Sequence, residues 1–215
     1  MTRAPVLAAF AVGATGIVVL ACVAMGPIAG HMALHIAAMN VAAPLASAAL
    51  FAFGSTMPHL RVGLWPAAMM QMALLWAWHS PAVQHIAHGS AGVAAFMHLV
   101  LFLSAVVFWF AIIDRRTPWS AIAALLVSGK LACLLGVLLV FSPRLLMTQS
   151  HFSHAGHEAA VSAAALADQH LAGLLMITAC PLSFVLAAIV LVAQGLDELR
   201  HARPRAFQGS RSYGG

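Results

Sequence analysis

The chain has 215 residues, of which 63% are hydrophobic and only 7% are charged. A soluble domain usually carries about 25% charged residues, so this composition excludes a soluble domain and predicts a polytopic membrane protein. The net charge of +5 does not indicate nucleic-acid binding, because the basic residues lie at the ends of apolar stretches and not in one patch. The three cysteines form no CxxC motif, which argues against a disulfide framework or a thiolate metal site.

Six apolar stretches reach or nearly reach the length of about 20 residues that a helix needs to cross a bilayer. They are residues 5–25, 30–53, 63–79, 92–113, 119–141 and 168–194. The fold class that they predict is all-α, a polytopic membrane bundle of six transmembrane helices. We expect residues 1–199 to form one transmembrane domain, with the first span retained, and residues 200–215 to form a basic, disordered cytoplasmic tail.

The arginines predict the orientation of this bundle. Arg144 falls on the side opposite to all the others, which are Arg3, Arg61, Arg115, Arg116, Arg200, Arg203, Arg205 and Arg211. Because cytoplasmic loops carry an excess of Lys and Arg, both termini are predicted to be cytoplasmic. Lys130 lies within the fifth span, where it needs a partner or a wet cavity unless its long side chain snorkels to the interface.

The second span opens with the first candidate metal ligands, His31 and His35, which are followed by Met39. Residues four apart share one face of a helix, so these side chains form a stripe that runs inward from the membrane surface. Two imidazoles and a thioether suit a soft or borderline metal such as copper. The alternative is that interfacial histidines only cap the helix and hydrogen-bond to water.

The distribution of the other histidines favours the metal-site interpretation. In the six-span arrangement, ten of the twelve histidines lie on or near the outer face: His31, His35, His79, His85, His88, His98, His151, His154, His157 and His170. His98 stands within a span, where polar side chains tend to face the bundle interior and to mark function. Among the loop histidines, solvation explains those at 85 and 88, whereas those at 151–157 fit solvation or weak metal capture.

The sixth span begins with Asp168, which is followed by Gln169, His170, Gly173 and Met176. An acidic residue at a helix N-terminus is favoured by the helix dipole and can cap free N–H groups, which would explain Asp168 without a functional role. Gly173 would allow a neighbouring helix to approach closely. Met176, seven residues after Gln169, shares a helix face with it.

Five motifs follow one another along the chain. They are His31-Met-x-x-His35, Ala43-Pro44-Leu45, Trp78-His79-x-Pro81, His98 with Phe108-Trp109, and Asp168-Gln169-x-x-Ala172-Gly173-x-x-Met176. Together, from about residue 30 to residue 194, they resemble the CtaG family of multi-span bacterial cytochrome c oxidase assembly factors. The resemblance implies a multi-pass protein of the bacterial inner (plasma) membrane, not an enzyme, that brings copper to the catalytic subunit of a haem–copper oxidase or helps to assemble it.

The histidine pattern and the resemblance together predict one metal centre near the outer surface. Its candidate ligands are His31, His35, His79, His98, Met39, Met176, Asp168 and His170, with Met97 as a further soft ligand and Asp168 orienting an imidazole. Imidazole and thioether favour copper, as Cu(I). The expected partners are the oxidase catalytic subunit, a periplasmic or outer-face copper donor and the lipid bilayer, with no nucleic acid.

Three other functions stay open at this point. Paired histidines on neighbouring helices could ligate a haem, as in a membrane electron carrier. Lys130 and the methionines could line the path of a copper or proton transporter. The chain could also be a scaffold that holds oxidase subunits, with incidental histidines.

Overall fold

The computed structural model describes residues 25–52, 62–88, 90–113, 118–146 and 158–209, and every regular element in these ranges is helical. The elements are α2 (Pro27–Ala37), the π-helix η1 (Ala38–Ala42), α3 (Ala43–Ala52), α4 (Leu64–Trp78), α5 (Pro81–His88), α6 (Ala91–Ile113), α7 (Pro118–Phe141) and α8 (Glu158–Gly209). The all-α fold class is therefore confirmed for the described part of the chain.

Four of the predicted spans form helices that are long and apolar enough to cross a membrane. They are Pro27–Ala52, which joins α2, η1 and α3, Ala91–Ile113, Pro118–Phe141 and Ala163–Asp197. The predicted span 63–79 forms the 15-residue helix α4, which is shorter than the about 20 residues that a span needs. Residues 5–24 of the predicted span 5–25 lie outside the described residues. The count of six spans and the cytoplasmic termini thus stay predictions.

Helix α8 is longer than the predicted span 168–194, because its 52 residues run from Glu158 to Gly209. Residues 200–209, which the sequence assigns to a disordered tail, continue this helix. The loss of apolar side chains near residue 195 marks the end of the apolar stretch and not the end of the helix, since the backbone hydrogen bonds of a helix are internal to it.

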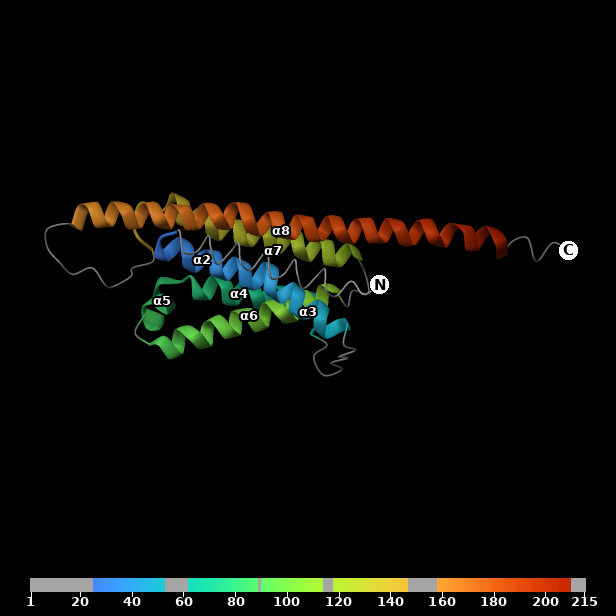
Figure 1. Cartoon of the computed structure of the whole chain (residues 1–215), viewed down its shortest axis with the longest axis horizontal. Coiled ribbons are helices and arrows are strands. Elements are labelled where there is room, and N and C mark those ends of the chain that lie inside the picture. The colour runs from blue at the N-terminus through green and yellow to red at the C-terminus, as the bar shows by residue number, and fades with distance from the viewer. Residues whose placement is uncertain (1–24, 53–61, 89, 114–117, 147–157, 210–215) are drawn as a thin grey trace.

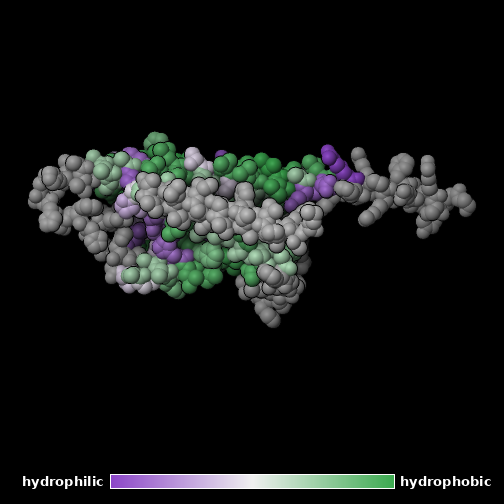
Figure 2. All heavy atoms as spheres, viewed as in Figure 1, coloured by the Kyte–Doolittle hydropathy of each residue, from purple (hydrophilic) through white to green (hydrophobic). Residues whose placement is uncertain are grey.

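The long helices lie roughly side by side (Figure 1). Helix α7 packs along α8, α2 packs against α8, α4 contacts both α6 and α7, and α3 contacts α6. Apolar side chains cover much of the middle of the bundle in Figure 2, and hydrophilic ones gather towards its ends. The exposed apolar side chains include Leu103, Leu134 and Ile189, and a surface of this kind suits contact with lipid tails.

The span Pro27–Ala52 changes its hydrogen-bond pattern at η1, just before Pro44. Proline has no N–H, and its ring clashes with the carbonyl four residues earlier. The N–H of Ala43 bonds instead to the carbonyl of Ala38, which leaves the Met39 carbonyl without its helical partner. The indole N–H of Trp109 in α6 donates to that carbonyl at 2.8 Å. The π-helix is thereby fixed to α6, with the Met39 side chain buried.

Helices α7 and α8 meet at two glycines, Gly136 and Gly173. A Cβ atom added to Gly173 would lie 2.8 Å from the carbonyl oxygen of Gly136, and one added to Gly136 would lie 2.9 Å from the carbonyl oxygen of Gly173. Small residues let helix backbones approach in this way. Further along, Pro181 removes the helical partner of the Ile177 carbonyl, and the Cys133 sulfur of α7 lies 3.9 Å from that oxygen.

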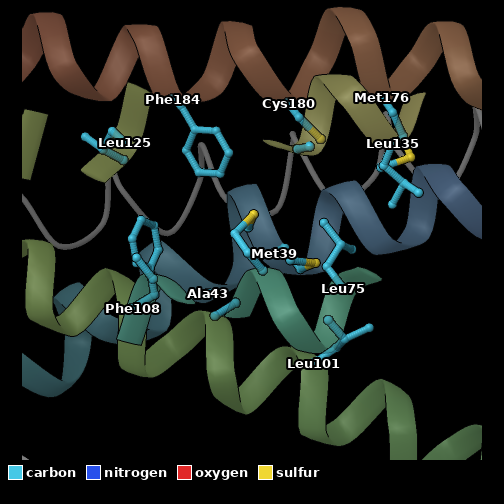
Figure 3. Close-up of a cluster of buried hydrophobic side chains, with 14 of the residues drawn as sticks. Met39, Ala43, Leu75, Leu101, Phe108, Leu125, Leu135, Met176, Cys180 and Phe184 are labelled. Atoms are coloured by element: carbon cyan, nitrogen blue, oxygen red, sulfur yellow. The ribbon is translucent and has the colours of Figure 1, made fainter. Parts of the chain in front are cut away.

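The buried core lies between α8 and the helices that face it. Figure 3 shows Met176, Cys180 and Phe184 reaching from α8 towards the helices that carry Met39 and Phe108. The Phe184 ring centroid lies 6.3 Å from that of Phe108. Aromatic rings thus fill one part of the core, and sulfur-bearing side chains gather in the part nearer the start of α8.

Replacing Gly173 with alanine is expected to destabilise the bundle. The new Cβ would lie 2.7 Å from the Val140 side chain and 2.8 Å from the Gly136 carbonyl, and overpacking of this kind costs typically about 1–3 kcal/mol. The midpoint of thermal unfolding in detergent, followed by helical circular dichroism, should fall. Gly195→Ala on the same helix is the matched control, since nothing lies within 4 Å of its added Cβ. An equal fall in both variants would rule out the α7–α8 contact as the cause.

Candidate metal centre

The first turn of α2 is held by a side chain from α8. Asp168 Oδ2 accepts a hydrogen bond from the Ile28 N–H at 2.7 Å, and Oδ1 accepts one from the Ala29 N–H at 3.3 Å. Helix N-termini leave such N–H groups without helical partners and favour negative charge, and Gly26 offers no side-chain cap. A Cβ atom on Gly26 would overlap the Asp168 carboxylate, so the cap fits because this position is a glycine.

One turn beyond this cap, His31 and His35 of α2 meet His98 of α6. The Nε2 atoms of His31 and His35 lie 2.9 Å apart, and the three imidazoles each offer a ring nitrogen within 4.8 Å of the other two. The His35 and His98 rings are stacked with centroids 4.7 Å apart, and the His31 ring stands edge-on at 5.0 Å from that of His98. We call these residues the three-histidine group.

The hydrogen bond of His98 leaves one of its nitrogens available to a metal. Its Nδ1 lies 2.6 Å from the carbonyl oxygen of Ala94, and a carbonyl oxygen only accepts, so Nδ1 carries the proton. In the neutral ring Nε2 is then a lone-pair acceptor. A backbone carbonyl that fixes the tautomer in this way is a common means of orienting metal-bound histidines.

The three-histidine group fits the dimensions of a metal site. Metal–nitrogen bonds of about 2.0 Å place three trigonal ligand atoms about 3.5 Å from one another. This value lies between the 2.9 Å separation of the His31 and His35 nitrogens and the 4.8 Å limit for the group. The buried Trp78 ring lies 5.4 Å from the His98 ring and 6.2 Å from the His35 ring, and such an apolar cover limits water access and lowers the local dielectric.

His79, which follows α4, borders a separate cavity. Its Nδ1 donates to the Leu75 carbonyl at 2.7 Å, and its Nε2 lies 3.3 Å from the sulfur of Met32. Its ring centroid is 6.1 Å from that of His35. The cavity has a volume of about 20 Å³, and its lining includes Met32, His35, Met39, Met72, His79, Met176 and Cys180. We call it the sulfur-lined cavity.

The predicted ligands therefore divide between two places. The three-histidine group unites His31, His35 and His98, and Met39, Met176 and His79 line the sulfur-lined cavity instead. His35 belongs to both. The assignment of these residues to one centre stays a prediction, because helix spacing shows which residues share a face but not how the faces of separate helices turn towards one another.

The remaining candidates lie elsewhere. The carboxylate of Asp168 binds backbone N–H groups of α2. His170 is half-buried on α8, outside the three-histidine group, and Met97 packs half-buried against the core. Lys130 is exposed on α7. The predictions on residues 151–157 fall outside the described residues.

Sequence reasoning missed three of the cavity residues, Met32, Met72 and Cys180. Met72 precedes His79 by seven residues, and Cys180 follows Met176 by four, so each shares a helix face with a predicted ligand. That spacing was a usable signal. Core packing is the ordinary role of a methionine within an apolar helix, since methionine fills irregular gaps between helices well, and Cys180 belongs to no CxxC motif.

Asp168→Asn is expected to weaken metal binding although Asp168 contacts no metal-ligating atom. The change removes the negative charge at the N-terminus of α2 and places an amide against N–H donors, which loosens the helix that carries His31 and His35. Because Asp168 acts on the ligands only through the helix that carries them, we expect a loss of about tenfold, the lower end of the range for groups that hydrogen-bond to the ligands themselves. Cu(I) affinity, measured by competition with a chromophoric chelator, checks this. Asp197→Asn, exposed towards the other end of α8, is the control, and an equal loss there would contradict the explanation.

Comparison with known proteins places the chain in a family. Comparisons with curated proteins and with solved structures gave no significant match. The sequence model of the family described as cytochrome c oxidase caa3 assembly factor (Caa3_CtaG) matches residues 4–198. This range contains all five motifs and both the three-histidine group and the sulfur-lined cavity. The resemblance predicted from the motifs is confirmed, and the chain belongs to the family of cytochrome c oxidase caa3 assembly factors.

Proposed function

We propose that the chain binds Cu(I) through the three-histidine group and passes it to the catalytic subunit of a haem–copper oxidase. The observation that carries this proposal is the convergence of three imidazole nitrogens within 4.8 Å, one of them on a ring whose tautomer is set by a backbone carbonyl. The family relation supports a cytochrome c oxidase as the recipient.

Several features favour Cu(I) as the ion. The three-histidine group contains no carboxylate, so it lacks the ligand that Mg²⁺ and Ca²⁺ prefer. Three neutral imidazoles leave the charge of the ion uncompensated, and burying one positive charge costs far less than burying two. Zinc also binds three histidines, but the neighbouring thioethers favour the softer ion.

The position of the group suits an ion that is carried and released. It lies towards the end of the bundle where α2 and α6 begin (Figure 1), and His31 and His98 are only half-buried. An ion held by three protein ligands keeps an open position for a further ligand. Cu(I) would arrive from a donor at the outer face and leave by ligand exchange, with its oxidation state unchanged.

The metal proposal is tested on the full-length protein in detergent. His98→Ala is expected to lower Cu(I) affinity by about tenfold or more, whereas His170→Ala, outside the group, should keep the wild-type affinity. Anaerobic competition with a chromophoric Cu(I) chelator, a parallel zinc titration and a visible spectrum give the readouts. Equal losses in both variants, or a wild type that prefers zinc or binds neither ion, would contradict the proposal. A haem absorption band would favour the electron carrier instead.

Copper delivery to the oxidase is tested in a bacterial host from which the gene that encodes this chain has been removed. Expression of the wild-type chain should restore the copper content and activity of the oxidase under limiting copper. The double variant His31→Ala/His35→Ala should not, and excess copper should restore part of the loss. Full oxidase activity with the double variant, at equal abundance in the membrane, would show that the chain acts as a scaffold. Copper flux across sealed vesicles would favour a transporter.

A further inference from the structure

The sulfur-lined cavity lies further along α2 than the three-histidine group. Met39 follows His35 by one turn of α2 and η1, and from α8 Met176 and Cys180 point towards the same region (Figure 3). All of the methionines that line it are buried, with Met32, Met39, Met72 and Met176 between 1% and 6% exposed. Four thioethers, a thiol and two imidazoles therefore surround one small space.

The contacts of His79 suit a cation-binding role. Its Nδ1 faces the Leu75 carbonyl at 2.7 Å, so Nδ1 carries the proton and the Nε2 of the neutral ring presents a lone pair. That lone pair faces the Met32 sulfur at 3.3 Å, and a thioether has no proton to donate. Two electron-pair donors thus face each other in a buried place. A soft cation bound by both would turn this contact into a favourable one.

The size and chemistry of the cavity suit an ion better than a water molecule. A volume of about 20 Å³ is enough for one water-sized occupant. A buried water, however, needs two to four polar partners, and this lining is mostly thioether and aliphatic. Asn40, a polar exception, already hydrogen-bonds to the Cys180 thiol. Methionines that served only as packing would be flexible enough to close such a gap.

We propose that the sulfur-lined cavity is a second Cu(I) site, distinct from the three-histidine group and built from His79, Met32 and the surrounding methionine sulfurs. His35 lines the cavity and also belongs to the three-histidine group, so it connects the two sites. Cu(I) moves inward as bonds to His79 and Met32 form and bonds to His31 and His98 break, with no electron transferred. This inference rests on the proposed function only in that the chain binds Cu(I), and it does not depend on the recipient.

The test combines copper stoichiometry with X-ray absorption on the full-length protein in detergent, loaded anaerobically with Cu(I). The wild type is expected to hold two Cu(I) ions per chain and to show sulfur as well as nitrogen neighbours. Met72→Leu/Met176→Leu, which nearly conserves side-chain volume, should lose one ion and most of the sulfur signal. His31→Ala should lose the other ion and keep that signal.

Met69→Leu/Met70→Leu is the matched control, because these neighbours on α4 are 58% and 40% exposed and it should retain both ions. Helical circular dichroism and size-exclusion elution confirm that each variant is folded. A wild type that binds only one ion, with nitrogen neighbours alone or with mixed neighbours, would overturn the second site. Two ions that survive in Met72→Leu/Met176→Leu would also overturn it. A wild type that binds no Cu(I) would overturn this inference together with the proposed function, so the two failures are distinguishable.

Discussion

Asp168 of α8 accepts hydrogen bonds from the first N–H groups of α2, and this contact sets where along its axis α2 begins. The helix carries His31 and His35, so its start also sets the height at which their imidazoles meet His98. A carboxylate at a helix N-terminus gains from hydrogen bonds and from the helix dipole together. In an apolar bundle, where water is scarce, the N–H groups of α2 would otherwise lose their partners at a high cost.

The position of the Asp168 cap depends on the position of α8. The residues that follow Asp168 fix α8 against its neighbours. Gln169 accepts a hydrogen bond from the Leu146 N–H at 2.7 Å and donates to the Arg144 carbonyl at 3.2 Å, which ties the chain beyond α7 to α8. Gly173 brings the backbone of α8 against α7, and Met176 enters the sulfur-lined cavity. One short motif therefore holds three parts of the protein around the candidate site.

Much of this arrangement could be predicted from the sequence, because it depends on helical spacing. The shared face of His31 and His35 follows from side-chain periodicity, the inward position of His98 from the cost of a polar group within a span, and the close approach at Gly173 from its small size. The family relation is confirmed by the match over residues 4–198. Other features depend on how separate helices are rotated. The spacing of Asp168 suggested a cap on its own helix, whereas it caps α2. The π-helix before Pro44 replaces the regular helical hydrogen-bond pattern around Met39, and no periodic pattern foresees that change.

The length of α8 has a consequence for the shape that the protein presents to other molecules. A helix of 52 residues is about 78 Å long, whereas the hydrocarbon core of a bilayer is about 30 Å thick. An upright α8 would have about 40% of its length within the lipid tails, and a tilt of up to about 40° would raise that share to about half. The remainder extends past the hydrocarbon layer at the two ends of the helix, so that backbone hydrogen-bonded within the helix reaches the headgroups and water.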